Sequence, residues 1–241
     1  MYKSKILAVA LTMGLSFAAQ AEWKGQGEAG LIVASGNTDS ENANVGLKFT
    51  KEGEIWTHEL GFGLYRASAD DIDTAESLYA KYDIKRDLNE RSFLFGSLSY
   101  LDDDFDGFTE QSSVAVGYGY RIYDTEPTGW NVGAGVGYRD TSQLMLLEDG
   151  TEIEGEDVSG ATFVLFSNYR HQLTSNTQFL SDFVAEIGSD NTYVESDTSL
   201  LVSMSEAFAL KAGVLFRHNT DPAPEADDTD TISSLNLVYN F

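Results

Sequence analysis

The acidic residues of one short segment are spaced like the start of a calcium-binding loop. Asp102, Asp104 and Asp106 alternate and are followed by Gly107, and in this D-x-D-x-D-G spacing the carboxylates can converge on a hard cation. A complete EF-hand loop needs an acid at its twelfth position, where this chain has Ser113, and it also needs flanking helices. The pattern therefore favours an acidic, solvated loop, with the three aspartates as a weak calcium candidate. No other metal site is predicted.

The chain contains three histidines, His58, His171 and His218, and each lies near the end of a predicted strand. A lipid hydrolase at a membrane surface would need a histidine beside a serine on its lipid-facing side. His171 and Ser167 share a face, but their separation along one strand is too long for a direct hydrogen bond. We therefore predict no catalytic residues and no enzymatic activity. A hydrogen-bonding serine partner for His171 on a neighbouring strand would reverse this interpretation.

The composition excludes several other kinds of chemistry. The 241 residues include no cysteine, which removes thiol chemistry, disulfides and Cys/His zinc clusters. No glycine-rich phosphate-binding loop occurs, and no cofactor is predicted. The formal net charge of −24 repels nucleic acid and excludes it as a partner. Such acidity attracts divalent cations, although solubility alone also explains it.

Polar and apolar residues alternate along most of the chain, as they do in β-strands with one apolar face. The last segment is the clearest, because Leu235, Leu237, Tyr239 and Phe241 share one side. All three prolines fall in connections, and proline cannot donate to a strand ladder. The alternation predicts about twelve strands, at residues 23–35, 40–51, 54–66, 75–87, 91–102, 109–123, 129–140, 158–172, 176–188, 192–204, 207–219 and 229–241.

The predicted connections alternate in length. Those after even-numbered strands are short, whereas those after odd-numbered strands include the long ones, at residues 67–74, 103–108, 141–157 and 220–228. Short periplasmic turns and longer outer loops are typical of bacterial outer-membrane barrels. We therefore predict an all-β fold, a single antiparallel transmembrane β-barrel of about 12 strands. An even strand number places both termini in the periplasm.

The two faces of the predicted strands differ in chemistry, with apolar side chains outward and polar ones in the lumen. Unpaired charge in a narrow space is costly, so we expect ion pairs across the interior. The predicted lumen residues are Lys24, Glu28, Lys48, Glu59, Lys81, Asp83, Lys85, Arg121, Arg139, Arg170, Asp182, Glu186, Asp197, Lys211 and Arg217. Aromatic residues near strand ends suit interfacial girdles, namely Trp23, Trp56, Trp130, Tyr138, Tyr169 and Phe241.

The strand at 91–102 does not resolve into two faces. Phe93 and Phe95 compete with Leu94, Leu98 and Tyr100 for the apolar side, and a β-bulge would reconcile the two phases.

The next two strands place five glycines on the lumen side: Gly117, Gly119, Gly133, Gly135 and Gly137. They leave a flat patch that either widens a channel or makes room for long side chains from the opposite wall, arginine and glutamate among them. Packing or curvature is favoured over a binding site.

The first 21 residues have the features of a secretory signal peptide. Lys3 and Lys5 precede an apolar run at 6–19, and Ala-Gln-Ala ends at Ala21. The run is shorter than the roughly 20 residues of a membrane-spanning helix. We predict a signal peptide at 1–21 and an outer-membrane barrel domain at 22–241.

Several separated phrases resemble the YdiY-like family, a domain of unknown function whose members are described as salt-induced outer-membrane proteins. They are GEAGLIVASGNTD at 27–39, RSFLFGSLSYLDDDFDGF at 91–108, GYGYRIYDTE at 117–126 and LNLVYNF at 235–241. The resemblance covers nearly all of 22–241. It implies an outer-membrane barrel with an osmotic or salt-related role, and it supplies no catalytic residues.

Together these observations predict a non-enzymatic outer-membrane barrel of a Gram-negative bacterium, acting as a narrow pore or as an envelope protein linked to salt. Expected partners are membrane lipid and lipopolysaccharide, with divalent cations at acidic outer loops such as 221–230. The alternatives are a lipid-acting hydrolase and a soluble periplasmic ligand-binding barrel with polar residues outside. The loop at 141–157 carries an apolar cluster at 144–147 and either folds into the lumen or extends its two strands as a hairpin. The oligomeric state stays open.

Overall fold

The computed structural model describes residues 23–35, 40–69, 72–103, 108–146, 152–154, 158–189, 191–222 and 227–241. Twelve of the thirteen strands in this part of the chain form one antiparallel barrel, and β8 pairs only with the end of β7. The strands are β1 (Trp23–Ser35), β2 (Ser40–Glu52), β3 (Trp56–Ala69), β4 (Ile72–Asp87), β5 (Ser92–Asp103), β6 (Phe108–Asp124), β7 (Thr128–Leu146), β8 (Glu152–Glu154), β9 (Val158–Gln172), β10 (Thr177–Ile187), β11 (Thr192–Ser203), β12 (Phe208–Asn219) and β13 (Thr229–Asn240). The predicted barrel and its strand number are confirmed. In the described ranges no helix is long and apolar enough to cross a membrane.

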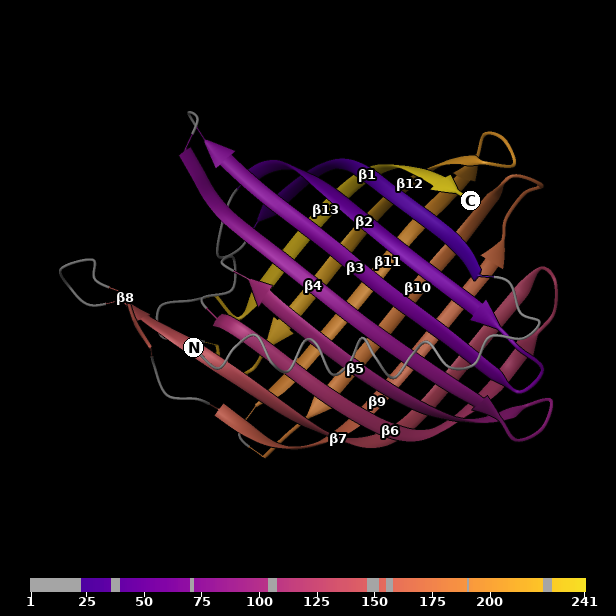
Figure 1. Ribbon diagram of the computed structural model, residues 1–241, viewed down its shortest axis with the longest axis horizontal. Coiled ribbons are helices and arrows are strands. Elements are labelled where there is room, and N and C mark those ends of the chain that lie inside the picture. The colour runs from indigo at the N-terminus through magenta and orange to yellow at the C-terminus, as the bar shows by residue number, and fades with distance from the viewer. Residues whose placement is uncertain are drawn as a thin grey trace.

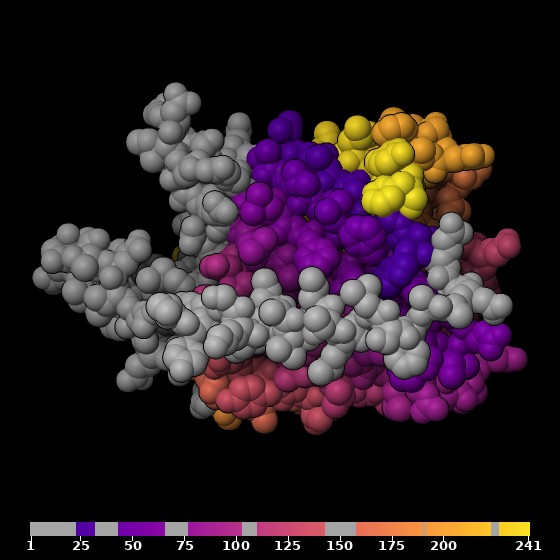
Figure 2. Space-filling view, in the orientation of Figure 1, coloured from indigo at the N-terminus to yellow at the C-terminus, as the bar shows by residue number. Residues whose placement is uncertain are grey.

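The barrel closes where the last strand meets the first. β13 pairs with β1 from Gln26↔Asn240 to Ser35↔Thr231. The C-terminal Phe241 exchanges two backbone hydrogen bonds with Gly25, of 2.7 and 2.8 Å. Figure 1 shows the inclined strands, and Figure 2 shows the yellow C-terminal strand against the indigo first strand. Closure pairs the strand edges, which a sheet in lipid requires because no water is available to satisfy them.

The two ends of the barrel differ in their connections, as predicted. At one end, called the short-turn end, strands are joined by residues 53–55, 88–91, 125–127, 173–176 and 204–207. Polar side chains satisfy the backbone there: Asn89 Oδ1 accepts from the N–H groups of Arg91 and Ser92, both at 2.9 Å, and Ser205 Oγ accepts from Phe208 N–H at 3.0 Å. The start of β1 and the end of β13 lie at this short-turn end (Figure 1).

The opposite, long-loop end carries a hairpin. β7 runs past the point where it last pairs with β9, at Thr141↔Val158, and continues to pair with β8 from Leu144↔Glu154 to Leu146↔Glu152. In Figure 1 this extension projects beyond the barrel wall. Of the two alternatives for 141–157, the described backbone therefore corresponds to the hairpin rather than to a plug.

The outer surface is apolar across the middle of the strands. Leu31, Val116 and Val136 are 70%, 57% and 62% exposed, and they alternate with inward-facing neighbours. No soluble protein leaves a continuous band of this kind to water, and the hydrocarbon of a membrane covers it in transmembrane barrels. The alternative with polar residues outside does not fit this surface.

An aromatic girdle surrounds the short-turn end of the outer surface. Its contacts run through three groups of rings: Trp56, His58 and Tyr82; Tyr123, Trp130, Tyr169, His171 and Phe179; and Phe49, Phe208, Tyr239 and Phe241. Lys51 lies over the Trp23 ring and Arg86 over the Trp56 ring, at 5.8 and 5.7 Å from the ring centres. Amphipathic rings and snorkelling cations of this kind suit a membrane–water interface.

Candidate functional site: a lumen with two sectors

The inward side chains divide the lumen into two parts of different chemistry. The aromatic sector consists of Phe93 and Phe95 on β5, Phe166 on β9, and the glycines of β6 and β7 between them. The charged sector lies on β1–β4, β11 and β12, and comprises Glu28, Lys48, Glu59, Lys81, Asp83, Asp197 and Lys211. The candidate functional site is this divided lumen.

The three phenyl rings of the aromatic sector pack across two intervening strands. Phe95 meets Phe166 edge to face, with ring centres 5.0 Å apart at 87°, and Phe93 lies 6.4 Å from Phe166. Such edge-to-face geometry is favourable for aromatic pairs. Phe93 is 1% exposed and the neighbouring Val164 is 4% exposed. This sector is dry.

Glycines of β6 and β7 form the floor on which these rings lie. A Cβ atom at Gly119 would overlap the Phe93 ring, and one at Gly133 would overlap the Phe166 ring. At Gly117 and Gly135 it would meet both a phenyl ring and the facing backbone. The predicted packing role of the glycines is confirmed. Their partners, however, are phenylalanines from nearby strands rather than charged side chains from the opposite wall.

The predicted bulge in the strand at 91–102 is wrong for most of its length. The β5–β6 register is unbroken from Ser92↔Tyr120 to Leu101↔Gln111 and shifts only beyond Leu101. Leu94 and Leu98 are 42% and 49% exposed on the outer face, while the phenylalanines point inward. Polarity alone could not separate these residues into two faces, because the glycine floor that admits the rings belongs to other strands.

Two cations flank Phe93 at the short-turn end of the lumen. Lys85 Nζ lies 5.9 Å and the Arg121 guanidinium 5.1 Å from the ring centre. Arg121 also forms an ion pair with Asp87. The positive groups therefore contact the negative face of an aromatic ring, which stabilises charge in a partly desolvated place.

The charged sector contains ion pairs, as predicted. Lys48 Nζ lies 2.7 Å from Glu59 Oε1, and Lys81 Nζ lies 3.3 Å from Asp83 Oδ2. Lys211 Nζ lies between Glu28 Oε2 and Asp197 Oδ2, at 3.8 and 3.7 Å.

The charged sector is also accessible to water. The side chains of Lys81, Lys48 and Asp197 are 54%, 48% and 38% exposed, although they point into a closed barrel. Solvent-exposed side-chain surface inside a closed barrel indicates aqueous space in this part of the lumen. This contrasts with the aromatic sector, where Phe93 and Val164 are almost fully buried.

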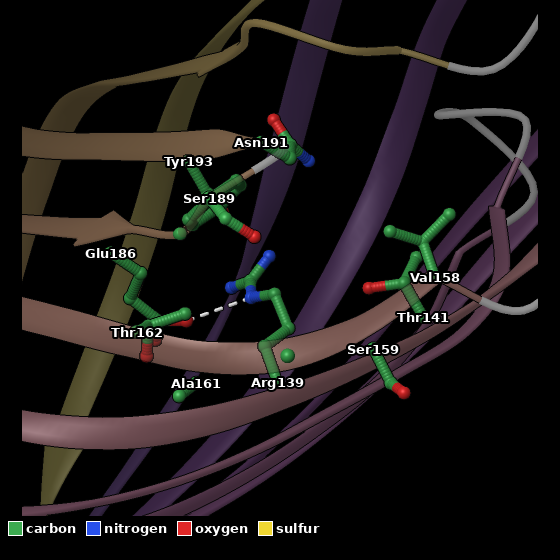
Figure 3. A pocket seen from close by; sticks show the side chains of 12 residues that line it. Arg139, Thr141, Val158, Ser159, Ala161, Thr162, Glu186, Ser189, Asn191 and Tyr193 are labelled. Atoms are coloured by element: carbon green, nitrogen blue, oxygen red, sulfur yellow. Dashed lines mark hydrogen bonds and ion pairs between the residues drawn. The ribbon is translucent and has the colours of Figure 1, made fainter.

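A buried polar cluster, here called the Arg139 network, lies towards the long-loop end (Figure 3). Arg139 Nε donates to Glu186 Oε2 at 2.7 Å, and Arg139 Nη1 donates to Gln111 Oε1 at 3.0 Å. The guanidinium also stacks 4.1 Å from the centre of the Tyr193 ring. The side chains of Arg139 and Glu186 are only 15% and 10% exposed. Their charges are satisfied by each other and by neighbouring polar groups, as buried charges must be.

The network continues to β12 through two residues that the sequence analysis did not name as lumen positions. Tyr193 Oη donates to Glu195 Oε2 at 2.6 Å, and Glu195 Oε2 lies 3.4 Å from Arg217 Nε. Tyr193 and Glu195 share the strand face of Asp197, so extending the alternation towards the start of that strand would have found them.

A shallow pocket opens beside the Arg139 network, as Figure 3 shows. Arg139 and Tyr193 line it together with the hydroxyl and amide side chains of Thr162, Ser189 and Asn191. These groups can hydrogen-bond a polar solute at the long-loop end of the lumen.

The calcium candidate is only partly described. Asp102 lies in β5, while Asp104 and Asp106 fall outside the described residues. Within the described ranges, no group of three or more His, Cys, Asp or Glu residues is placed to hold a metal ion.

The histidines lie on the outer face, each bonded to a hydroxyl group. His171 Nδ1 is 2.7 Å from Thr128 Oγ1, and Ser167 Oγ instead accepts from Trp130 Nε1 at 3.0 Å. His58 pairs with Tyr82 Oη at 2.8 Å and His218 with Thr229 Oγ1 at 3.0 Å. The His171–Ser167 pair that the hydrolase alternative considered is therefore replaced by two other contacts.

A closed barrel with an apolar outer band, an aromatic girdle and a polar, partly aqueous interior defines a transmembrane β-barrel of the Gram-negative outer-membrane class. The chain belongs to the family described as "Protein of unknown function, DUF481", whose model matches residues 27–241. It is 26% identical over 225 residues to "Uncharacterized protein YdiY" of Escherichia coli strain K12, covering 92% of this chain and 85% of that protein. The resemblance to the YdiY-like family is confirmed.

Solved structures agree on the fold. The NanC porin superposes with a TM-score of 0.53 at 8% identity, covering 90% of this chain and 99% of the porin. The translocator domain of the autotransporter NalP from Neisseria meningitidis has a TM-score of 0.51 at 14% identity, covering 97% and 93%. An outer-membrane channel from Pseudomonas putida F1 has a TM-score of 0.51 at 11% identity, covering 94% and 97%. At these identities the likeness concerns the fold alone.

Proposed function

We propose that this protein is a narrow, water-filled pore of the outer membrane that passes small solutes and catalyses no reaction. One observation carries the proposal: charged side chains that point into the closed barrel keep water-accessible surface, most clearly Lys81 at 54% and Lys48 at 48%. Water in a lumen with charged walls is what a diffusion pore requires. The NanC porin and the Pseudomonas putida channel, by their names, have functions of this class.

The pore is narrow because only part of the lumen holds water. The phenyl rings of the aromatic sector and the buried Arg139 network fill much of the side formed by β5–β7, β9 and β10. The path therefore runs along the charged sector, next to β1–β4, β11 and β12. A route of this shape admits inorganic ions and small polar molecules.

The orientation follows the general rule for bacterial barrels. The short-turn end, where β1 begins and β13 ends, faces the periplasm, and the long-loop end faces outward. Acidic outer loops would then bind divalent cations that bridge them to lipopolysaccharide phosphates. Protease digestion of whole cells tests the orientation: cleavage within the long connections is expected, and cleavage within the short turns of intact cells contradicts it.

The family resemblance adds a role in salt response to the proposal. A pore for small ions fits such a role because external salt changes the ion gradient across the outer membrane. Growth of a deletion strain over a range of sodium chloride concentrations tests it. Growth identical to the parent strain at every concentration removes the link to salt.

Conductance measurements test the pore itself. The folded protein, extracted from outer membranes in detergent, is inserted into planar lipid bilayers in potassium chloride. Discrete, small current steps are expected, with liposome swelling that falls steeply as solute size increases. A heat-denatured sample is the control. Insertion without current steps, together with liposomes no leakier than protein-free ones, contradicts the proposal.

A further inference from the structure

One charged cluster in the aqueous part of the lumen is unbalanced. Lys211 on β12 reaches past β13 to Glu28 on β1 and across to Asp197 on β11. Two carboxylates thus share one ammonium group. Both distances, 3.8 and 3.7 Å, are longer than a hydrogen bond, whereas the Lys48–Glu59 pair is in contact at 2.7 Å. Neither carboxylate of the cluster is tightly neutralised.

The side chains of the cluster converge on the lumen. Glu28 lies against Gly46 on β2, where a Cβ atom would come within 3.0 Å of Glu28 Oε1. Asp197 Oδ1 lies over Gly213, the next inward residue after Lys211, at 3.7 Å from a Cβ atom placed there. Glycine at both positions leaves room for the two carboxylates beside the lumen wall.

A third oxygen lies beside the cluster without a partner. Asn236 on β13 stands directly opposite Lys211 on one side and Gly30 on the other. Asn236 is 2% exposed, and its Oδ1 has no hydrogen-bond partner in the part of the chain that the structure describes. This oxygen lies over Gly30, the next inward position of β1 after Glu28, where a Cβ atom would overlap it. A buried acceptor without a donor is costly, and a cation relieves that cost.

The ion-paired residues of the charged sector also include more acidic than basic groups. The ion pairs described in the charged sector and at its border with the Arg139 network contain five carboxylates and four cationic groups. Within these ion pairs, the additional carboxylate belongs to the cluster in which two carboxylates share Lys211.

We propose that Glu28, Asp197 and Asn236 form a weak cation subsite in the pore, with the Lys211 ammonium as its tethered occupant. This subsite makes the pore prefer small inorganic cations over anions. Oxygen ligands suit alkali and alkaline-earth cations, and weak binding allows a permeating ion to leave again. The inference rests on the proposed pore and names the class of solute that it passes.

The reversal potential in a potassium chloride gradient tests the subsite. Wild-type channels are expected to prefer potassium over chloride. Lys211→Met removes the tethered cation and leaves two carboxylates, so the preference for potassium should rise severalfold, and millimolar calcium should then block the current. Glu28→Gln with Asp197→Asn should shift the preference in the opposite direction, towards chloride.

Two controls keep the result interpretable. Lys51→Met makes the same charge change on the outer face, where Lys51 lies over the Trp23 ring, and it should leave the reversal potential unchanged. Lys211→Arg keeps the charge and should retain the wild-type preference. A folded Lys211→Met channel with the wild-type reversal potential overturns the subsite and leaves the pore standing. Wild-type protein that inserts but never conducts overturns both.

Discussion

The two sectors of the lumen share one barrel wall, yet they handle charge in opposite ways. In the dry part, Arg139 and Glu186 are in contact at 2.7 Å and almost fully enclosed. In the charged sector, Lys211 lies 3.7–3.8 Å from its two acids and Lys81 is 54% exposed. Coulomb attraction is strong where water is absent and weak where water screens it. In the proposed pore, the same residue types therefore stabilise the wall on one side and line the ion path on the other.

The comparison also explains how a lumen can be both filled and aqueous. Phe93, Phe95 and Phe166 fill their side of the lumen only because facing glycines leave room for the rings. On the other side, long flexible side chains leave gaps between them. In the proposed pore this arrangement gives an eccentric path, whose width would depend on how well the aromatic sector packs.

Breaking the buried ion pair should have the largest effect. Arg139→Met leaves Glu186 charged, enclosed and without its main partner, so we expect a loss of about 4 kcal/mol in the free energy of unfolding. Urea unfolding in lipid vesicles, followed by tryptophan fluorescence, measures it. The double variant Arg139→Met/Glu186→Leu should recover most of the loss. A double variant as unstable as the single one would contradict the dry character of this site.

Removing the central ring should be the next largest change. Phe166→Ala deletes the side chain that contacts both Phe93 and Phe95, and we expect a loss of about 3 kcal/mol from lost burial and the cavity left behind. Because the ring fills part of the lumen, single-channel conductance should rise. Phe166→Leu should recover much of the stability and lower the conductance again. An unchanged conductance in folded Phe166→Ala would mean that the rings do not limit the path.

Adding a methyl group to the glycine floor should cost less. In Gly117→Ala the new Cβ atom meets the Ala134 carbonyl oxygen and the Phe95 ring, so overpacking should destabilise the barrel by about 2 kcal/mol. Gly160→Ala is the matched control, because no atom lies within 4 Å of a Cβ atom there. The same unfolding assay compares the two. Equal stabilities would show that the floor tolerates side chains and that glycine is not required for the rings.

The exposed ion pair should show the smallest effect. Lys48 and Glu59 are in contact but 48% and 36% exposed, and we expect a coupling energy below about 1 kcal/mol, as for surface pairs. A double-mutant cycle with Lys48→Met and Glu59→Gln measures this coupling at low and high salt, and high salt should reduce it further. A coupling as large as that of Arg139 and Glu186 would erase the distinction between the sectors.

The bounds of the strands could be predicted closely because they depend on local signals. Alternation of polarity repeats every two residues and needs no knowledge of neighbours, so the ranges found at 40–51, 158–172 and 192–204 differ little from β2, β9 and β11. Lumen charges such as Lys48, Glu59 and Lys211 followed from the same alternation. Connection length was equally local, and it distinguished the two ends of the barrel.

The sequence by itself therefore determined a closed sheet with an apolar exterior and a charged interior, since each residue's side follows from its position along its own strand. Only the tertiary structure decided which inward residues meet. Phe93 and Phe95 point inward because glycines on β6 and β7 leave room, and Arg139 pairs with Glu186 two strands away. Strand tilt and register determine these side-chain contacts across the lumen, and the polarity pattern of a single strand carries no information about them.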